Sequence, residues 1–162
     1  MLALHCQTSV LTSMANALAD IIDDFALIED WDERYRYLIE LGRALQPLPD
    51  NLRTEANKVR GCASQVWIAT ETSNDNALVI QGDSDAHIVK GLVKLTLAIF
   101  DGLEPAVVLQ TDASAIFGQL GLSQHLTPQR SNGVRAMVQR IRDDAQAAIT
   151  QGLTTQSSTA TG

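Results

Sequence analysis

The sequence predicts an α+β protein in which a small antiparallel three-stranded sheet packs against several helices. Residues 65–72 and 77–81 are short runs rich in apolar and β-branched side chains, and the turn-forming residues 73–76 between them indicate a β-hairpin. Residues 58–60 are expected to add the third strand. The segments on both sides of this region repeat apolar residues at the spacing of amphipathic helices, which would cover the sheet.

Two helices are expected ahead of the sheet. Met14–Ile28 carries apolar side chains at close to helical spacing, with aspartates on the opposite side. A second helix is expected to begin after Asp30, a good N-cap residue, with Glu33 three residues later as in a variant capping box. It should run to about Leu45, because the prolines that follow cannot continue it. The acidic residues of both helices are interpreted as a solvated face.

A long apolar helix is expected directly after the sheet. Gly82–Asp85 should end the sheet, and either Ser84 or Asp85 should cap a helix over Ile88–Phe100, since their side-chain oxygens can accept from free backbone N–H groups. That helix is apolar almost all round, which is typical of a central helix packed against a sheet.

The remainder of the chain is expected to be helical, with short breaks. The expected parts are a short helix over Pro105–Gln110, a helix capped by Asp112 that ends at Leu120 before Gly121, a loop over Ser123–Thr127, and a last helix from Pro128 to about Ile149.

Composition fits one globular domain. The chain has 162 residues, 45% of them hydrophobic, and we expect a single domain over residues 1–150 followed by a disordered tail over 151–162. A net charge of −7 without a basic stripe argues against a nucleic-acid-binding protein. No apolar run approaches the roughly 20 residues that span a bilayer. The apolar Met1–Val10 lacks the basic start and cleavage site of a secretory signal.

The two cysteines, Cys6 and Cys62, have the spacing of neither a disulfide framework nor a metal site. This favours a cytoplasmic protein whose thiols stay reduced. Cys62 lies where a polar connection gives way to the first strand, beside Gly61, which would give the loop backbone freedom. Arg60 and Lys58 just upstream would favour the thiolate, which is the nucleophilic form. The alternative is that Cys62 is a small buried hydrophobic residue.

Four blocks of sequence carry a resemblance to a known family. They are Trp31-x-Glu33-x-Tyr35-x-Tyr37-Leu38-Ile39-Glu40-Leu41-Gly42, Val59-x-Gly61-Cys62-x-Ser64-Gln65-Val66-Trp67, Gln81-Gly82-Asp83-Ser84-Asp85-Ala86 with Ile88-Val89-Lys90-Gly91-Leu92, and Leu120-Gly121-Leu122 with His125-Leu126-Thr127-Pro128-x-Arg130-Ser131-x-Gly133. In this order and with similar spacings, over about residues 25 to 145, they resemble the SufE/CsdE family.

This resemblance implies a SufE/IscU-like fold and a function in sulfur transfer. Cys62 would accept persulfide sulfur from a pyridoxal-phosphate-dependent cysteine desulfurase of the SufS or CsdA kind, stimulate that enzyme, and pass the sulfur to an iron–sulfur scaffold or another acceptor. The chain would thus be an accessory protein rather than a free-standing enzyme. It would need no cofactor or metal of its own and would be a monomer or weak homodimer. The choice between the SufE and CsdE subtypes stays open.

The resemblance also implies roles for residues around Cys62. Ser64 and Gln65 would shape the loop, although both could simply begin the strand. Asp85 would influence how readily the loop opens, with helix capping as the alternative. Arg130 would contact the partner enzyme; as a surface residue it would oppose the dipole of its helix. Ala63 departs from the polar or acidic residue common in the family, which concerns the fine adjustment of the loop.

Three other functions remain open, one of which is a module that only binds a partner. An iron–sulfur scaffold of the IscU type would need about three converging ligands, and the sequence shows one loop cysteine and no CxxC cluster. A cysteine hydrolase would use Cys62 as nucleophile and His87 or His125 as base, although His125 is more readily interpreted as a structural histidine. Cys6 is interpreted as an incidental thiol.

Finally, we expect the resting protein to shelter Cys62, because an exposed persulfide would be stripped by cellular thiols. Val66, Trp67 and Leu92 are the expected walls of the sheltering pocket. Burial also disfavours the thiolate, so the free protein would react slowly until the loop is moved.

Overall fold

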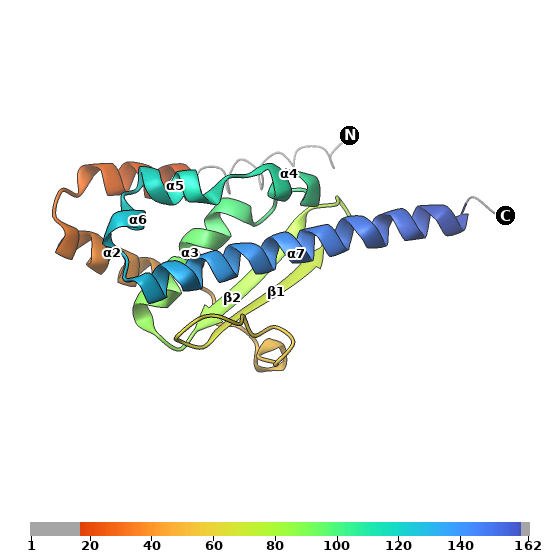
Figure 1. Cartoon of the computed structure of the whole chain (residues 1–162), viewed down its shortest axis with the longest axis horizontal. Coiled ribbons are helices and arrows are strands. Elements are labelled where there is room, and N and C mark those ends of the chain that lie inside the picture. The colour runs from red at the N-terminus through yellow and green to blue at the C-terminus, as the bar shows by residue number, and fades with distance from the viewer. Residues whose placement is uncertain (1–16, 160–162) are drawn as a thin grey trace, which may run out of the picture.

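The structure, a computed structural model, describes residues 17–159 and has the expected α+β architecture, with helices packed around an antiparallel sheet (Figure 1). After helical residues 17–27, the elements are α2 (Trp31–Arg43), η1 (Asp50–Leu52), β1 (Val66–Thr72), β2 (Leu78–Ser84), α3 (His87–Phe100), α4 (Pro105–Gln110), α5 (Ala113–Gln119), α6 (Leu122–His125) and α7 (Pro128–Thr159).

The predicted hairpin is present. β1 and β2 pair antiparallel from Val66 opposite Ser84 to Thr72 opposite Leu78, and Asn76 in the turn takes a positive φ of 60°. β2 is longer than expected, because the strand continues through Asp83 instead of ending before it.

Asp83 can lie inside a strand because its buried carboxylate is neutralised. It is 2.5 Å from the Arg53 guanidinium and 3.7 Å from the Lys90 ammonium. The Asp83 carboxylate also accepts from the backbone N–H groups of Leu48, at 3.4 Å, and Ser84, at 2.8 Å. A buried carboxylate without such partners would be costly, so the network fixes the segment after α2 against the sheet.

The prediction of a third strand is wrong, since the sheet of the described residues has two. Residues 57–59 do run beside β1: the Val59 N–H donates to Val66, and the Ile68 N–H donates to Asn57, both at 2.8 Å. The pairing stops at an isolated bridge between Lys58 and Trp67. It cannot continue because the chain turns at Gly61, where φ is +92°.

The predicted central helix is confirmed, and it lies between the sheet, α2 and α7 (Figure 1). Its buried side chains are Leu92, Val93, Leu95, Thr96, Ile99 and Phe100. The predicted cap is wrong: the N-cap position of α3 is Ala86, and no side chain caps the helix.

α2 begins after Asp30, as expected, but the Asp30 side chain makes no capping hydrogen bond, so the predicted capping box does not form. The helix ends at Arg43, slightly before the predicted Leu45. It crosses α3 closely, because a Cβ added to Gly42 would lie only 2.8 Å from the backbone nitrogen of Gly91.

The C-terminal helices largely follow the prediction. α4 has the expected bounds, and Asp112 caps α5 by accepting from the Ala115 N–H at 3.1 Å. Gly121 takes a left-handed φ of 74° after α5. A loop was expected over Ser123–Thr127, but its first three residues belong to the short helix α6.

The last helix, α7, is longer than expected. It continues beyond the predicted end near Ile149 to Thr159, into the segment expected to be a disordered tail, and its C-terminal part extends past the rest of the body (Figure 1). The part of α7 up to Ala145 packs on the core through Val134, Met137, Ile141 and Ala145.

Candidate functional site

Cys62 lines a cavity of about 250 Å³ where three segments distant in the sequence meet. These segments are the loop before β1, the first half of α3 and the start of α7, and each belongs to a different one of the sequence blocks described above. The lining includes Cys62, Ser64, Ile88, Leu92, Arg130 and Met137. Most of the described residues that line the cavity are apolar, and the Cys62 thiol is among the lining groups.

The Cys62 thiol is half-buried, and its Sγ donates to the carbonyl oxygen of Gly133 in α7 at 3.6 Å. Burial raises the pKa of Cys62 above its ordinary value. The expectation that Arg60 would favour the thiolate is not met, since the exposed Arg60 side chain pairs with Glu55 at 3.2 Å. In this conformation the neutral thiol is favoured.

Gly61 allows the chain to turn into the cysteine loop. Its φ of +92° is a conformation that other residues rarely adopt. Ser64 lines the cavity, as does the exposed Ala63. The loop thus places Cys62 against α7 and leads directly into β1.

Asp85 forms hydrogen bonds with the end of this loop and does not cap α3. Its carboxylate accepts from the Gln65 N–H at 3.0 Å, and its own N–H donates to the Gln65 carbonyl at 3.3 Å. The Ser84 hydroxyl also donates to that carbonyl, at 2.8 Å. Gln65 is therefore held through its backbone, at the junction of the loop and β1.

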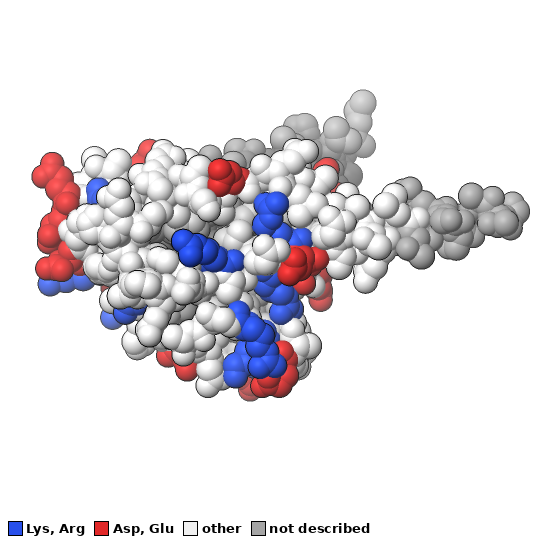
Figure 2. All heavy atoms as spheres, viewed as in Figure 1, with Lys and Arg blue, Asp and Glu red and all other residues white. Residues whose placement is uncertain are grey.

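Arg130 lies on the first turn of α7 and lines the cysteine cavity. Its backbone N–H donates to the Thr127 hydroxyl at 3.3 Å, and its guanidinium forms no ion pair with any residue that the structure describes. On the face shown in Figure 2, Lys and Arg gather over α7 and the segment before β1, whereas Asp and Glu gather where residues 17–27 meet α2.

The two described histidines do not line the cysteine cavity. The His125 ring stacks on Trp31 with centroids 3.5 Å apart, and its Nδ1 lies 3.0 Å from the Gly121 carbonyl oxygen. The Tyr35 hydroxyl donates to the backbone carbonyl of His125. This supports the structural interpretation of His125, while His87 is exposed at the start of α3.

The expected walls were partly correct. Leu92 lines the cavity, but Val66 and Trp67 do not. The sequence analysis assigned no role at the cavity to Gly133 and Met137, which both line it. Gly133 lies close to the loop, since an added Cβ would be 3.5 Å from Sγ of Cys62. A glycine inside a helical pattern was the available signal for Gly133. Cys6 lies outside the described residues.

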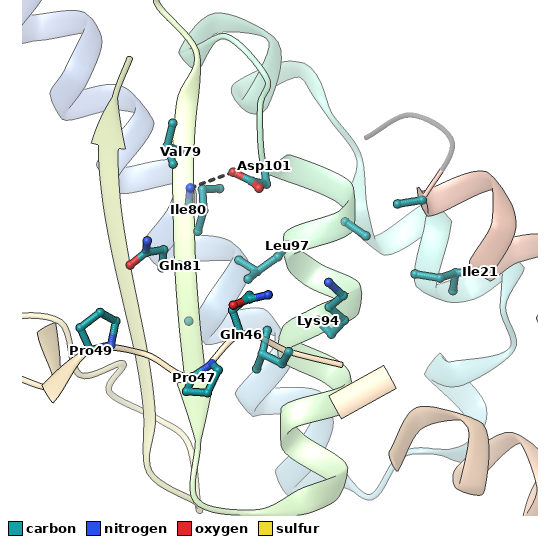
Figure 3. Close-up of a pocket in the computed structure, with 14 residues that line it drawn as sticks. Ile21, Gln46, Pro47, Pro49, Val79, Ile80, Gln81, Lys94, Leu97 and Asp101 are labelled. Carbon is teal, nitrogen blue, oxygen red and sulfur yellow. Dashed lines mark hydrogen bonds between the residues drawn. The ribbon is translucent and has the colours of Figure 1, made fainter. Parts of the chain in front are cut away.

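A larger cavity of about 620 Å³ lies between residues 17–27, the segment after α2, β2 and α3 (Figure 3). Ile21, Pro47, Lys94 and Asp101 are among its lining residues. Asp101 accepts from the Ile80 N–H at 2.9 Å, and burial raises the pKa of Asp101. No cysteine or histidine is among the described residues that line this cavity, so the smaller one is the candidate site for thiol chemistry.

The described residues contain no group of three or more His, Cys, Asp or Glu side chains arranged to hold a metal ion. None of the helices in the described part of the chain combines the length and apolar character required to cross a membrane.

Comparison with known proteins shows which family this chain resembles. The SufE family, described as an Fe–S metabolism associated domain, matches residues 19–154. An uncharacterized SufE-like protein from Rhizobium meliloti is 49% identical over 136 residues, covering 82% of this chain and 97% of its own. Another, from Rhizobium etli, is 52% identical over 132 residues, covering 80% and 89%.

The fold is also found in a solved structure. The solution structure of a hypothetical protein from Thermus thermophilus superposes with a TM-score of 0.67, covering 82% of this chain and 96% of its own, at 21% identity. The family match takes in the cysteine loop, α3 and the start of α7, whose residues line the cavity, and also the β1–β2 hairpin. The chain therefore belongs to the SufE family, an Fe–S metabolism associated domain.

Proposed function

We propose that this protein accepts sulfur as a persulfide on Cys62 and carries it toward iron–sulfur cluster assembly. The observation that supports the proposal most directly is the position of Cys62 at an apolar cavity built from three blocks of sequence that resemble the SufE/CsdE family. The donor would be a pyridoxal-phosphate-dependent cysteine desulfurase, which performs the difficult cleavage of the C–S bond. We further propose that the protein acts in the cytoplasm.

The transfer step resembles thiol–disulfide exchange. The Cys62 thiolate attacks the outer sulfur of the donor persulfide, a new S–S bond forms at Cys62, and the donor S–S bond breaks. The donor cysteine leaves as a thiolate, so no external oxidant or reductant is consumed. The proton lost from Cys62 passes to solvent or to the departing thiolate.

The half-buried thiol suits a carrier whose reactivity is controlled by the partner. In the closed loop, burial raises the pKa of Cys62, so a small fraction is thiolate near neutral pH. Movement of the loop would return the thiol to solvent and restore its ordinary pKa. Arg130 at the cavity is then placed to meet an acidic or anionic group of the partner.

The two alternatives have less support from the site. An iron–sulfur scaffold needs about three converging ligands, and Cys62 has no histidine or carboxylate beside it among the described lining residues. A hydrolase needs a base within hydrogen-bond reach of the thiol. The cavity lining offers neither His87 nor His125 for that role.

The intact mass of the protein tests the proposal. After mixing with a cysteine desulfurase and cysteine, we expect sulfur to be added at one site, mapped to Cys62 by peptide analysis. Release of the added sulfur by a thiol reductant would identify a persulfide. Retention of iron without added sulfur would instead favour the scaffold.

Asp85→Arg is expected to make Cys62 more reactive toward a neutral alkylating agent. The change removes the hydrogen bond from the loop end to the carboxylate, and a lost hydrogen bond of about 1 kcal/mol corresponds to roughly five-fold faster alkylation. The pH at half-maximal rate should also fall, because an opened loop no longer raises the pKa of Cys62.

Glu29→Arg, the same charge change at an exposed residue remote in sequence, is the control and should leave the rate unchanged. A parent protein whose Cys62 already alkylates as fast as in the unfolded chain would contradict the sheltered site.

Arg130→Ala is expected to reduce stimulation of the desulfurase about tenfold or more, because a lost hydrogen bond to a charged group costs about 1.5–3 kcal/mol. The melting temperature should stay close to that of the parent, since Arg130 has no ion pair among the described residues. Arg36→Ala, at an exposed position of α2, is the matched control. Equal losses of stability and stimulation would make Arg130 a structural residue.

A further inference from the structure

Gly133 is buried within α7, where glycine is less favourable than alanine because it has more backbone freedom to lose. The helix contains a second described glycine, Gly152, which has nothing within 4 Å of an added Cβ. Gly133 differs from it, because an added Cβ would lie 3.5 Å from Sγ and 3.9 Å from Cβ of Cys62. The atom nearest to an added Cβ at Gly133 is therefore the Cys62 sulfur.

The same residue also binds the thiol, since Sγ of Cys62 donates to the Gly133 carbonyl oxygen at 3.6 Å. On the other side of the loop, Asp85 holds Gln65 by two hydrogen bonds to its backbone. The closed loop is thus held both at its end, through the backbone of Gln65, and at the Cys62 sulfur itself.

We propose that Gly133 is a positioning residue for Cys62: its missing side chain leaves the space on α7 in which the Cys62 sulfur is sheltered. The inference deepens the proposed function and rests on it for the meaning of that shelter. A larger side chain at this position takes the place of Sγ and holds the cysteine loop open. Gly133 acts through Cys62 and does not itself react.

The space beside Gly133 also accommodates the second sulfur when Cys62 carries a persulfide. A second sulfur lies about 2.05 Å beyond Sγ. The cavity of about 250 Å³, which Gly133 lines, has room for it, since a water molecule takes only about 30 Å³ in the liquid. Arg130 is the charged residue among the described residues that line the cavity, so its cation would lie in the same cavity as the persulfide anion. A methyl group at Gly133 narrows this space while leaving Sγ in ordinary contact.

The test compares Gly133→Val, Gly133→Ala and the control Gly152→Ala. Alkylation of the resting thiol by iodoacetamide is followed across pH, with folding checked by circular dichroism. For Gly133→Val we expect about tenfold faster alkylation near neutral pH and a midpoint at lower pH, as burial is lost. For Gly133→Ala and Gly152→Ala we expect rates within about two-fold of the parent, because the alanine Cβ fits at 3.5 Å from Sγ.

The persulfide form of Cys62 is prepared with cysteine persulfide as the sulfur donor, so the test needs no partner enzyme. Cys62 takes the outer sulfur, and the donor leaves as cysteine. The persulfide on Gly133→Ala should be lost to a small thiol several-fold faster than on the parent or on Gly152→Ala. If Gly133→Val does not fold, the lifetime of the persulfide on Gly133→Ala tests the proposal instead.

A folded Gly133→Val protein with the rate and pH profile of the parent overturns the proposal. If Gly133→Val does not fold, equal persulfide lifetimes in Gly133→Ala and the parent overturn it. Failure of the proposed function looks different: the parent would gain no sulfur from a desulfurase, while the alkylation rates would still separate Gly133→Val from the control.

Discussion

Replacing Cys62 with serine is expected to abolish sulfur uptake completely while leaving the fold intact. A serine hydroxyl is not ionised near neutral pH and cannot form a persulfide, so the nucleophile of the transfer step is lost. The hydroxyl can still donate to the Gly133 carbonyl oxygen, so the loop keeps a partner on α7. Intact mass after mixing with a desulfurase and cysteine measures the uptake, and thermal unfolding measures the stability.

Cys6→Ser is the matched control, because it removes the other thiol of the chain by the same substitution. This variant should take up sulfur as the parent does. If Cys62→Ser still gained sulfur and Cys6→Ser did not, the assignment of the acceptor would be wrong.

The candidate site could be proposed from the sequence because its residues belong to short, local blocks. The blocks around Cys62, Asp85 and Arg130 are separate in the sequence, and the structure brings Cys62 and Arg130 to one cavity, with Asp85 at the end of the loop. Each block lies at the end of a helix or strand, where local signals such as glycine and proline are strong. Their convergence at one cavity follows from the fold, which packs the cysteine loop against α3 and α7.

The errors arose where tertiary contacts overrule local preferences. Asp85 and Ser84 were expected to cap α3, but both bind the backbone of Gln65. Asp83 was expected to end the sheet, and it stays in β2 because Arg53 and Lys90 neutralise it. Arg53 lies 30 residues away from Asp83 in the sequence, so local patterns do not reveal such a partner.

The pKa of Cys62 is another property that local sequence patterns do not predict. Sequence proximity to Arg60 predicted a stabilised thiolate, whereas Arg60 pairs with Glu55 and burial raises the pKa of the thiol. Burial depends on α7, whose contact with the loop is made at Gly133. The reactivity of the site is therefore a property of the packed structure and depends on how α3 and α7 are held.

Gly91→Ala is expected to cause the largest loss of stability among these variants. Gly91 lies where α3 crosses α2, and an added Cβ would overlap the carbonyl group of Leu38 in the α2 backbone. Backbone atoms of a packed helix cannot move aside singly, so α2 and α3 must separate. Overpacking of this kind costs about 3 kcal/mol or more, and chemical denaturation of the variant and the parent measures it.

The same substitution should also disturb the site, because α3 supplies the cavity wall through Ile88 and Leu92 on either side of Gly91. We therefore expect Cys62 to alkylate faster in any folded fraction. Gly118→Ala is the control: its added Cβ meets only the Ser123 hydroxyl, at 3.9 Å, so this variant should be as stable as the parent or more so. If Gly91→Ala unfolds at the same denaturant concentration as Gly118→Ala, the close crossing of α2 and α3 is not what fixes the wall of the cysteine cavity.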